Sequence, residues 1–386
     1  MKTVGIICEL NPMHKGHEHL VREVRSLGYD TVVAVMAGPF VQRGTPALCD
    51  KYLRAKIACE RGFDLCFELP QCTVLQGAHY YARGAVFELS KIKGLQAIAF
   101  GVEGEGGPQK LLRLQEKKNR TDWRVRLGQA WKEGSSYRRS MEAALQESLT
   151  PNLILGLEYL EAMREFSLSY QPLPIPRTYL RGEKGEAYSP SAGILRSMLV
   201  KVPREALPSL FPEEVSGWET LRQTAFTTYQ KNPPFREDFE PLFSFLKYGL
   251  LREQFQWERC PGYEPGLRER MDRAIAEGNS VREIIEKASN KRHSKSRIRR
   301  LLLTEFLNIH RQILPSYLRV LAFNERGRQL LRLQDCPLVQ KPARARLEGE
   351  DAHCFAMDCR AQRLQEALNG LPEGLDYAQR YFTPSS

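Results

Sequence analysis

Gly5-Ile-Ile-Cys-Glu-Leu-Asn-Pro-Met-His14-Lys-Gly-His17 carries the clearest structural signal in the chain, because an apolar run passes directly into a turn and then into a helical pattern. The run predicts a buried strand over 4–10, and apolar side chains spaced three and four residues apart predict a helix over 18–27. The turn presents backbone N–H groups at the start of a helix, where the helix dipole favours anions. The stretch therefore predicts a site for phosphate groups.

The residues that follow alternate between strand-like and helix-like patterns as far as residue 102. We expect strands over 30–37, 64–69 and 95–102, and helices over 47–61 and 79–92. This alternation is typical of parallel sheets with right-handed crossovers, so the fold class is α/β with a Rossmann-like, doubly wound sheet. Ligands of such sheets bind beyond the carboxyl ends of the strands, which here carry residues 11–17, 38–44, 68–70 and 101–103.

The length of 386 residues exceeds one ordinary core and indicates two domains. We expect a catalytic domain over 1–200, with a charged helical insertion over about 106–150, a helix over 151–164 and a proline-extended segment over 173–177. The second domain, over 201–386, is expected to be basic and mainly helical, with helices over 215–228, 241–252, 266–277, 280–290 and 296–314.

The formal net charge of +11 is concentrated in one part of the chain. Residues 281–346 contain sixteen Lys and Arg against five Asp and Glu, an excess equal to the net charge of the whole chain. Such a concentration favours a polyanionic partner such as a nucleic acid. The alternative is an exposed, solvated helix face, which is the commoner reason for a run of charges.

The composition also excludes several classes of protein. No window approaches the roughly eighteen uninterrupted apolar residues of a membrane helix, and polar residues interrupt the first apolar run too early for a signal peptide. We therefore expect a cytoplasmic protein without a membrane partner. The nine cysteines lack a C-x-x-C pair and indicate reduced, packed thiols. No metal site is expected, because His353, Cys354 and Cys359 are too few and too far apart for structural zinc.

The two histidines of the opening stretch have three possible uses. His14 and His17 can cap the helix that follows, as polar residues at such a position commonly do. They can form a metal-binding pair, although the sequence offers no third ligand nearby. They can also donate hydrogen bonds to charge that develops on a phosphate, with Gly16 allowing the backbone a close approach.

The sequence around these histidines resembles that of a known family. Asn11-Pro-Met-His14-Lys-Gly-His17 is similar to the His-x-Gly-His signature of the nucleotidyltransferase superfamily, and its surroundings resemble the bacterial tRNA(Met) cytidine acetate ligases. Further similar segments cover almost the whole chain, at residues 38–47, 50–51, 64–70, 100–103, 151–160 and 317–327.

The resemblance implies an enzyme that ligates acetate to the wobble cytidine of elongator tRNA(Met) and forms N4-acetylcytidine. ATP would activate acetate as acetyl-adenylate, with Mg²⁺ as the counter-ion of ATP, and acetyl-CoA would have no part. The partners are then acetate and elongator tRNA(Met). His14 and His17 would be the catalytic residues.

The resemblance also implies which residues contact ATP. These are Ile7, Cys8, Glu9, Leu10, Asn11, Pro12, Met13, His14, Lys15, Gly16, His17, Glu18, His19, Leu20, Gly101, Asn152, Arg177, Thr178, Ser191 and Arg196. A forked guanidinium such as that of Arg177 suits phosphate oxygens, and an amide such as that of Asn152 both donates and accepts. Without the resemblance, the pattern is explained equally well if Gly101 is a turn glycine, Asn152 is a helix N-cap and Arg177 is a surface cation.

The second signature of the superfamily is similar to residues 191–196, with one departure. Gly193 stands where family members usually carry Thr, so one hydroxyl for phosphate is missing, while Ser191 and Arg196 remain. We expect this change to weaken the handling of ATP without abolishing it. Leu10 and Met13 replace the usual aromatic residues, in positions expected to tune the packing near the site.

Within residues 281–346, residues 291–300 form the basic segment, which supplies the residues expected to dock tRNA: Lys291, Arg292, Lys295, Arg297, Arg299 and Arg300. Arg43 and Lys51 follow the second predicted strand, and each is either a ligand of phosphate or acetate or a solvated charge. Two other functions stay open. One is an adenylyltransferase acting on a small phosphorylated metabolite, and the other is a tRNA-binding paralogue with weakened catalysis, which Gly193 would explain.

Overall fold

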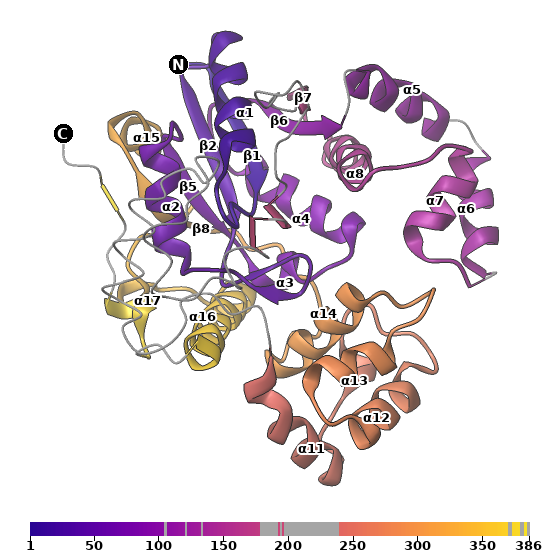
Figure 1. Cartoon of the computed structure of the whole chain (residues 1–386). Helices are drawn as coiled ribbons and strands as arrows, with labels where there is room; N and C mark the ends of the chain where they lie inside the picture. The colour runs from indigo at the N-terminus through magenta and orange to yellow at the C-terminus, as the bar shows by residue number, and fades with distance from the viewer. Residues whose placement is uncertain are drawn as a thin grey trace, which may run out of the picture.

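A seven-stranded sheet lies at the centre of the computed structural model, in the order β7-β6-β1-β2-β5-β8-β9 (Figure 1). The structure describes residues 1–103, 106–119, 122–132, 134–177, 192–193, 195–196, 239–369, 373–378 and 382–383. The strands of the sheet are β1 (Thr3–Cys8), β2 (Thr31–Ala37), β5 (Leu65–Leu69), β6 (Leu95–Glu103), β7 (Gln171–Arg177), β8 (Leu318–Phe323) and β9 (Leu338–Val339). A separate hairpin joins β3 (Phe40–Val41) to β4 (Thr45–Pro46).

The pairing confirms the Rossmann-like fold class. β1 lies parallel to both β2 and β6, and β5 continues the parallel run beyond β2. Because parallel neighbours end at the same edge, the carboxyl ends of β6, β1, β2 and β5 all lie at one edge of the sheet. We call it the carboxyl edge.

Helices cover both faces of the sheet because successive strand residues point to opposite sides. On one face, Ile6 and Ala34 pack with α1 (Lys15–Ser26) and α2 (Lys51–Glu60). On the other face, Val33 and Ile98 pack with α4 (Ala78–Ser90) and α8 (Pro151–Glu165). All four helices were expected from the sequence, although α2 begins later than predicted.

Two helical units leave the sheet. The insertion, residues 106–149, contains α5 (Gly107–Asn119), α6 (Trp123–Lys132) and α7 (Tyr137–Leu145). The helical module, residues 239–314, contains α11 (Phe243–Leu251), α12 (Leu267–Glu277), α13 (Val281–Ala288) and α14 (Lys295–Phe306). Its apolar side chains form one cluster with Phe40, Cys72 and Leu75 and with residues of α16 (Gly349–Asn369). In Figure 1 the insertion extends from α8, and the helical module lies on the side of α3 (Gln71–Val74) and α16.

The second half of the chain contains the expected helical region, but its strands β8 and β9 belong to the central sheet. β8 returns to the sheet and pairs antiparallel with β5, so that Arg319 lies opposite Glu68. α14 ends at Phe306, short of the predicted 314, because Asn308 takes a left-handed conformation and the Ile309 N–H bonds back to the Thr304 carbonyl.

The helices α15 (Glu325–Leu331), α16 and α17 (Leu375–Ala378) follow β8. The boundary expected near residue 200 and the helix expected over 215–228 lie outside the described residues. Within the part of the chain that the structure describes, no helix is long and apolar enough to cross a membrane.

Candidate functional site

The two histidines lie together at the start of α1. His14 is the N-cap of this helix, and its Nδ1 accepts a hydrogen bond from the Gly16 N–H at 3.0 Å. His17 Nδ1 accepts one from the His14 N–H at 3.2 Å, which closes a capping box. The two ring centroids are 4.0 Å apart, so the imidazoles form one adjacent pair.

Both imidazoles are neutral hydrogen-bond donors at neutral pH. A backbone N–H can only donate, so each Nδ1 is unprotonated and each neutral ring carries its proton on Nε2. Burial, followed by the charges of Arg177 and Arg196, lowers the pKa of His14 to about 4. Burial and the neighbouring His14 hold the pKa of His17 well below its usual value. The helix-capping use and the phosphate-donor use are therefore compatible, because they employ different ring nitrogens.

Two arginines approach the histidine pair from later parts of the chain. Arg177 ends β7, and its positive charge lowers the pKa of both histidines. Arg196 is buried, and its Nη1 donates to the Asn11 carbonyl at 2.7 Å. This hydrogen bond joins the second signature to the first. A Cβ on Gly101 would lie 3.2 Å from Arg177 Cγ, so a larger residue would displace the arginine.

Asn152 is fixed beside the end of β6. Its Nδ2 donates to Glu103 Oε1 at 2.6 Å, while the Thr150 hydroxyl donates to the other oxygen of the same carboxylate. Thr150 also caps α8 by accepting from the Leu153 N–H. The start of α8 is thus fastened to the carboxyl edge.

The other residues expected around ATP divide between core and surface. Glu9 turns its Oε1 to the Gln42 N–H at 2.9 Å, and Asn11 Oδ1 accepts from the Leu48 N–H at 2.8 Å. Ile7, Cys8, Leu10, Pro12 and Met13 are buried, and Lys15, Glu18, His19 and Leu20 are half-buried on α1. Thr178 and Ser191 lie outside the described residues. Burial raises the pKa of the Cys8 thiol, which makes it a packing group.

Arg54 is a buried residue that the sequence analysis missed. From α2 its guanidinium donates to the carbonyls of Glu9 at 2.7 Å and Ala37 at 2.9 Å, and also to the carbonyl of Gly38. It therefore ties the ends of β1 and β2 together. No signal in the sequence separates it from the exposed arginines of other helices.

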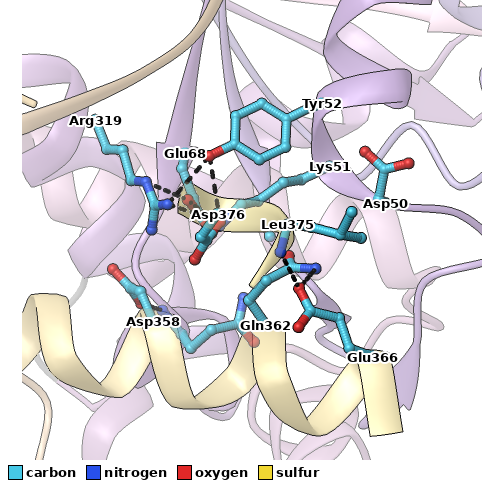
Figure 2. A network of polar contacts seen from close by, with 12 residues as sticks. Asp50, Lys51, Tyr52, Glu68, Arg319, Asp358, Gln362, Glu366, Leu375 and Asp376 are labelled. Carbon is cyan, nitrogen blue, oxygen red and sulfur yellow. Dashed lines mark hydrogen bonds and ion pairs between the residues drawn. The ribbon is translucent and has the colours of Figure 1, made fainter. Parts of the chain in front are cut away.

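Lys51 belongs to a buried charge network at the carboxyl edge (Figure 2). Its Nζ lies 2.8 Å from Glu68 Oε2 and 2.9 Å from Asp376 Oδ1. Arg319 contacts the same two carboxylates, at 3.1 and 2.8 Å. Of the two uses considered for Lys51, the solvated charge is excluded, because its side chain has no exposed surface. Arg43, in contrast, is exposed.

The basic segment leads from the helical module to the carboxyl edge. Arg300 Nη1 donates to the Gln42 carbonyl at 3.0 Å, and the Gln42 N–H in turn donates to Glu9 Oε1. A Cβ on Gly44 would lie 2.8 Å from Arg299 Cβ, so α14 packs directly on the loop that follows β2.

Three further members of the segment make ion pairs within the helical module. Arg292 and Arg297 each lie 2.8 Å from the Glu264 carboxylate, and Lys295 lies 3.0 Å from Glu286. Lys291 is exposed. Among the described residues, no group of three or more His, Cys, Asp or Glu side chains could hold a metal ion.

Comparison with known proteins shows which class of protein this chain belongs to. The model of the HIGH Nucleotidyl Transferase family matches residues 1–377, so the chain belongs to the HIGH-type nucleotidyl transferases. The tRNA(Met) cytidine acetate ligase of Caldanaerobacter subterraneus subsp. tengcongensis is 32% identical and covers 93% of each chain. That of Lysinibacillus sphaericus is 30% identical and covers 94% of each. The chain belongs to the tRNA(Met) cytidine acetate ligase family.

A solved structure supports the same assignment. Thermotoga maritima TmcAL, crystallised with alpha-thio ATP, superposes with a TM-score of 0.84 at 25% identity and covers 99% of both chains.

Proposed function

We propose that this protein uses ATP to ligate acetate to the wobble cytidine of elongator tRNA(Met), giving N4-acetylcytidine. The observation that carries the proposal is the pair of Nε2–H donors on His14 and His17, with Arg177 and Arg196 beside them. Two donors and two cations fit a phosphate group. Glu9 carries the only carboxylate within residues 7–17, and its Oε1 accepts a hydrogen bond from the Gln42 N–H. The names of the relatives support acetate and tRNA(Met) as substrates, and the bound nucleotide of the Thermotoga protein supports ATP.

The proposed reaction has two steps. An acetate oxygen attacks the α-phosphorus of ATP, the bond to the bridging oxygen breaks, and pyrophosphate leaves. The cytidine N4 then attacks the acetyl carbon, loses a proton, and AMP leaves. His14 and His17 would donate to the α-phosphate as its charge grows, while Arg177 and Arg196 would hold the departing phosphates. Mg²⁺ would enter with the phosphates of ATP.

The first step can be measured alone. We expect exchange of labelled pyrophosphate into ATP that depends on acetate and proceeds without acetyl-CoA. Exchange that depends on a small phosphorylated metabolite instead of acetate would favour the adenylyltransferase alternative. Tight tRNA binding without ATP binding in calorimetry would favour the paralogue that has weakened catalysis.

A further inference from the structure

The insertion is a second basic unit attached to the carboxyl edge. Residues 106–149 contain ten Lys and Arg against five Asp and Glu. The chain leaves the sheet at the end of β6 and returns at the start of α8, where Thr150 and Asn152 both donate to Glu103. Both ends of the insertion are therefore anchored at the edge that carries the histidine pair.

The insertion also meets the helical module. Gly134 lies in the turn between α6 and α7, and a Cβ placed on it would lie 3.9 Å from Arg292 Nη1. Arg292 belongs to the basic segment, whose Arg300 is bonded to the loop after β2. The two units thus both contact the carboxyl edge, and they approach each other at Gly134 and Arg292.

Unpaired cations lie close in sequence to this meeting point. Seven described cations of the insertion lie within ion-pair distance of a carboxylate: Lys110, Arg113, Lys117, Lys118, Arg124, Arg126 and Arg138. Within the described part of the insertion, Lys132 and Arg139 are the two without such a partner, and both are exposed. They flank Gly134 in sequence, and the exposed Lys291 adjoins Arg292 on the opposite side.

We propose that the insertion and the helical module form one RNA-docking surface, in which Lys132 and Arg139 bind phosphates of the tRNA beside the basic segment. The identity of the RNA rests on the proposed function. A tRNA that presents one base at the carboxyl edge must place its neighbouring phosphates on the protein surface around that edge. Exposed cations without a carboxylate partner neutralise these phosphates at the least cost in free energy. Cations already held by carboxylates would first have to break those pairs.

The test is direct binding of a labelled elongator tRNA(Met) transcript, without acetate or ATP. We expect Lys132→Glu with Arg139→Glu to raise the Kd at least tenfold at about 0.1 M salt and to reduce the slope of log Kd against log salt by roughly 1.5. The milder Lys132→Gln with Arg139→Gln should weaken binding in the same direction. Acetate-dependent pyrophosphate exchange should keep its wild-type rate in both variants, because neither residue belongs to the nucleotide site.

The matched control reverses two exposed arginines at α15, with Arg326→Glu inside the helix and Arg332→Glu at its C-cap, which changes the net charge equally. Figure 1 shows α15 and α7 on opposite sides of the molecule. An equal Kd for the insertion variant and the wild type, or an equal loss in the control, would overturn the docking proposal. Loss of binding in the insertion variant alone would uphold it, even if the protein failed to acetylate tRNA and so contradicted the proposed function.

Discussion

At the scale of single residues, the histidine pair combines a structural and a chemical role. Each Nδ1 is used by the backbone, which leaves each Nε2–H free to donate. The sequence could locate both rings, because the pattern of a strand followed by His-x-Gly-His and a helix is recognisable from the residues alone. It could not show that Arg54 joins the ends of β1 and β2, because that contact brings together the carbonyls of Glu9, Ala37 and Gly38 from two separate segments.

The lowered pKa of His14 predicts a loss of stability in acid. The folded protein holds His14 neutral down to about pH 4, whereas the unfolded chain protonates near pH 6.5, so protons favour unfolding between these values. We expect His14 to contribute about 2 kcal/mol to the fall in unfolding free energy between pH 7 and pH 5. Urea unfolding of wild type and His14→Asn, which keeps an N-cap acceptor, measures this difference. Equal pH slopes for the two proteins would contradict it.

Removal of one donor should separate catalysis from RNA binding. We expect His17→Ala to lower acetate-dependent pyrophosphate exchange by roughly 100-fold or more, as loss of a donor to developing charge does in other enzymes. The Kd for tRNA should stay within about twofold, since the ring lies at the nucleotide site. Equal losses of exchange and tRNA binding would show that His17 is structural.

At the scale of elements, the contact between α14 and the loop after β2 joins the helical module to the site. Gly44 has a φ of +71°, and a Cβ there would lie 2.8 Å from both Arg299 Cβ and Arg300 N. Gly44→Ala should therefore cost backbone strain of roughly 1–2 kcal/mol and a steric clash in addition.

Gly28→Ala is the control that separates the steric clash from the backbone strain. Gly28 has a φ of +84°, but a Cβ on it would meet nothing within 4 Å, so this variant carries the strain alone. Thermal unfolding should show the larger loss for Gly44→Ala. Equal losses would mean that α14 does not press on the loop.

Local patterns predicted the elements of the first hundred residues well, and the differences have local causes. α2 begins at Lys51 because Asp50 caps it and the Leu48 N–H is used by Asn11. The prolines of β7 were expected to extend the chain, and because they occupy alternate positions they leave the intervening N–H groups free to pair with β6. β8 was missed, because its partner β5 lies about 250 residues earlier and no local pattern encodes that pairing.

At the scale of the whole molecule, the buried network of Figure 2 joins distant parts of the chain. Lys51 and Glu68 come from the first hundred residues, whereas Arg319 and Asp376 come from the last. Lys51→Met should lower the unfolding free energy by about 3–5 kcal/mol, because two buried carboxylates then share one cation. Lys56→Met on the same helix removes a half-exposed pair with Glu60 and should cost less than about 1 kcal/mol. Chemical denaturation compares the two, and similar losses would contradict the role of the network.

The proposed function depends on one reaction. Purified protein should transfer labelled acetate from solution to the wobble cytidine of elongator tRNA(Met) when ATP is present, with one AMP and one pyrophosphate formed per acetyl group. Nucleoside analysis of the digested tRNA measures the product directly. We predict N4-acetylcytidine that appears with acetate and ATP and is absent without either. Transfer from acetyl-CoA alone, or no transfer from acetate at all, would contradict the account.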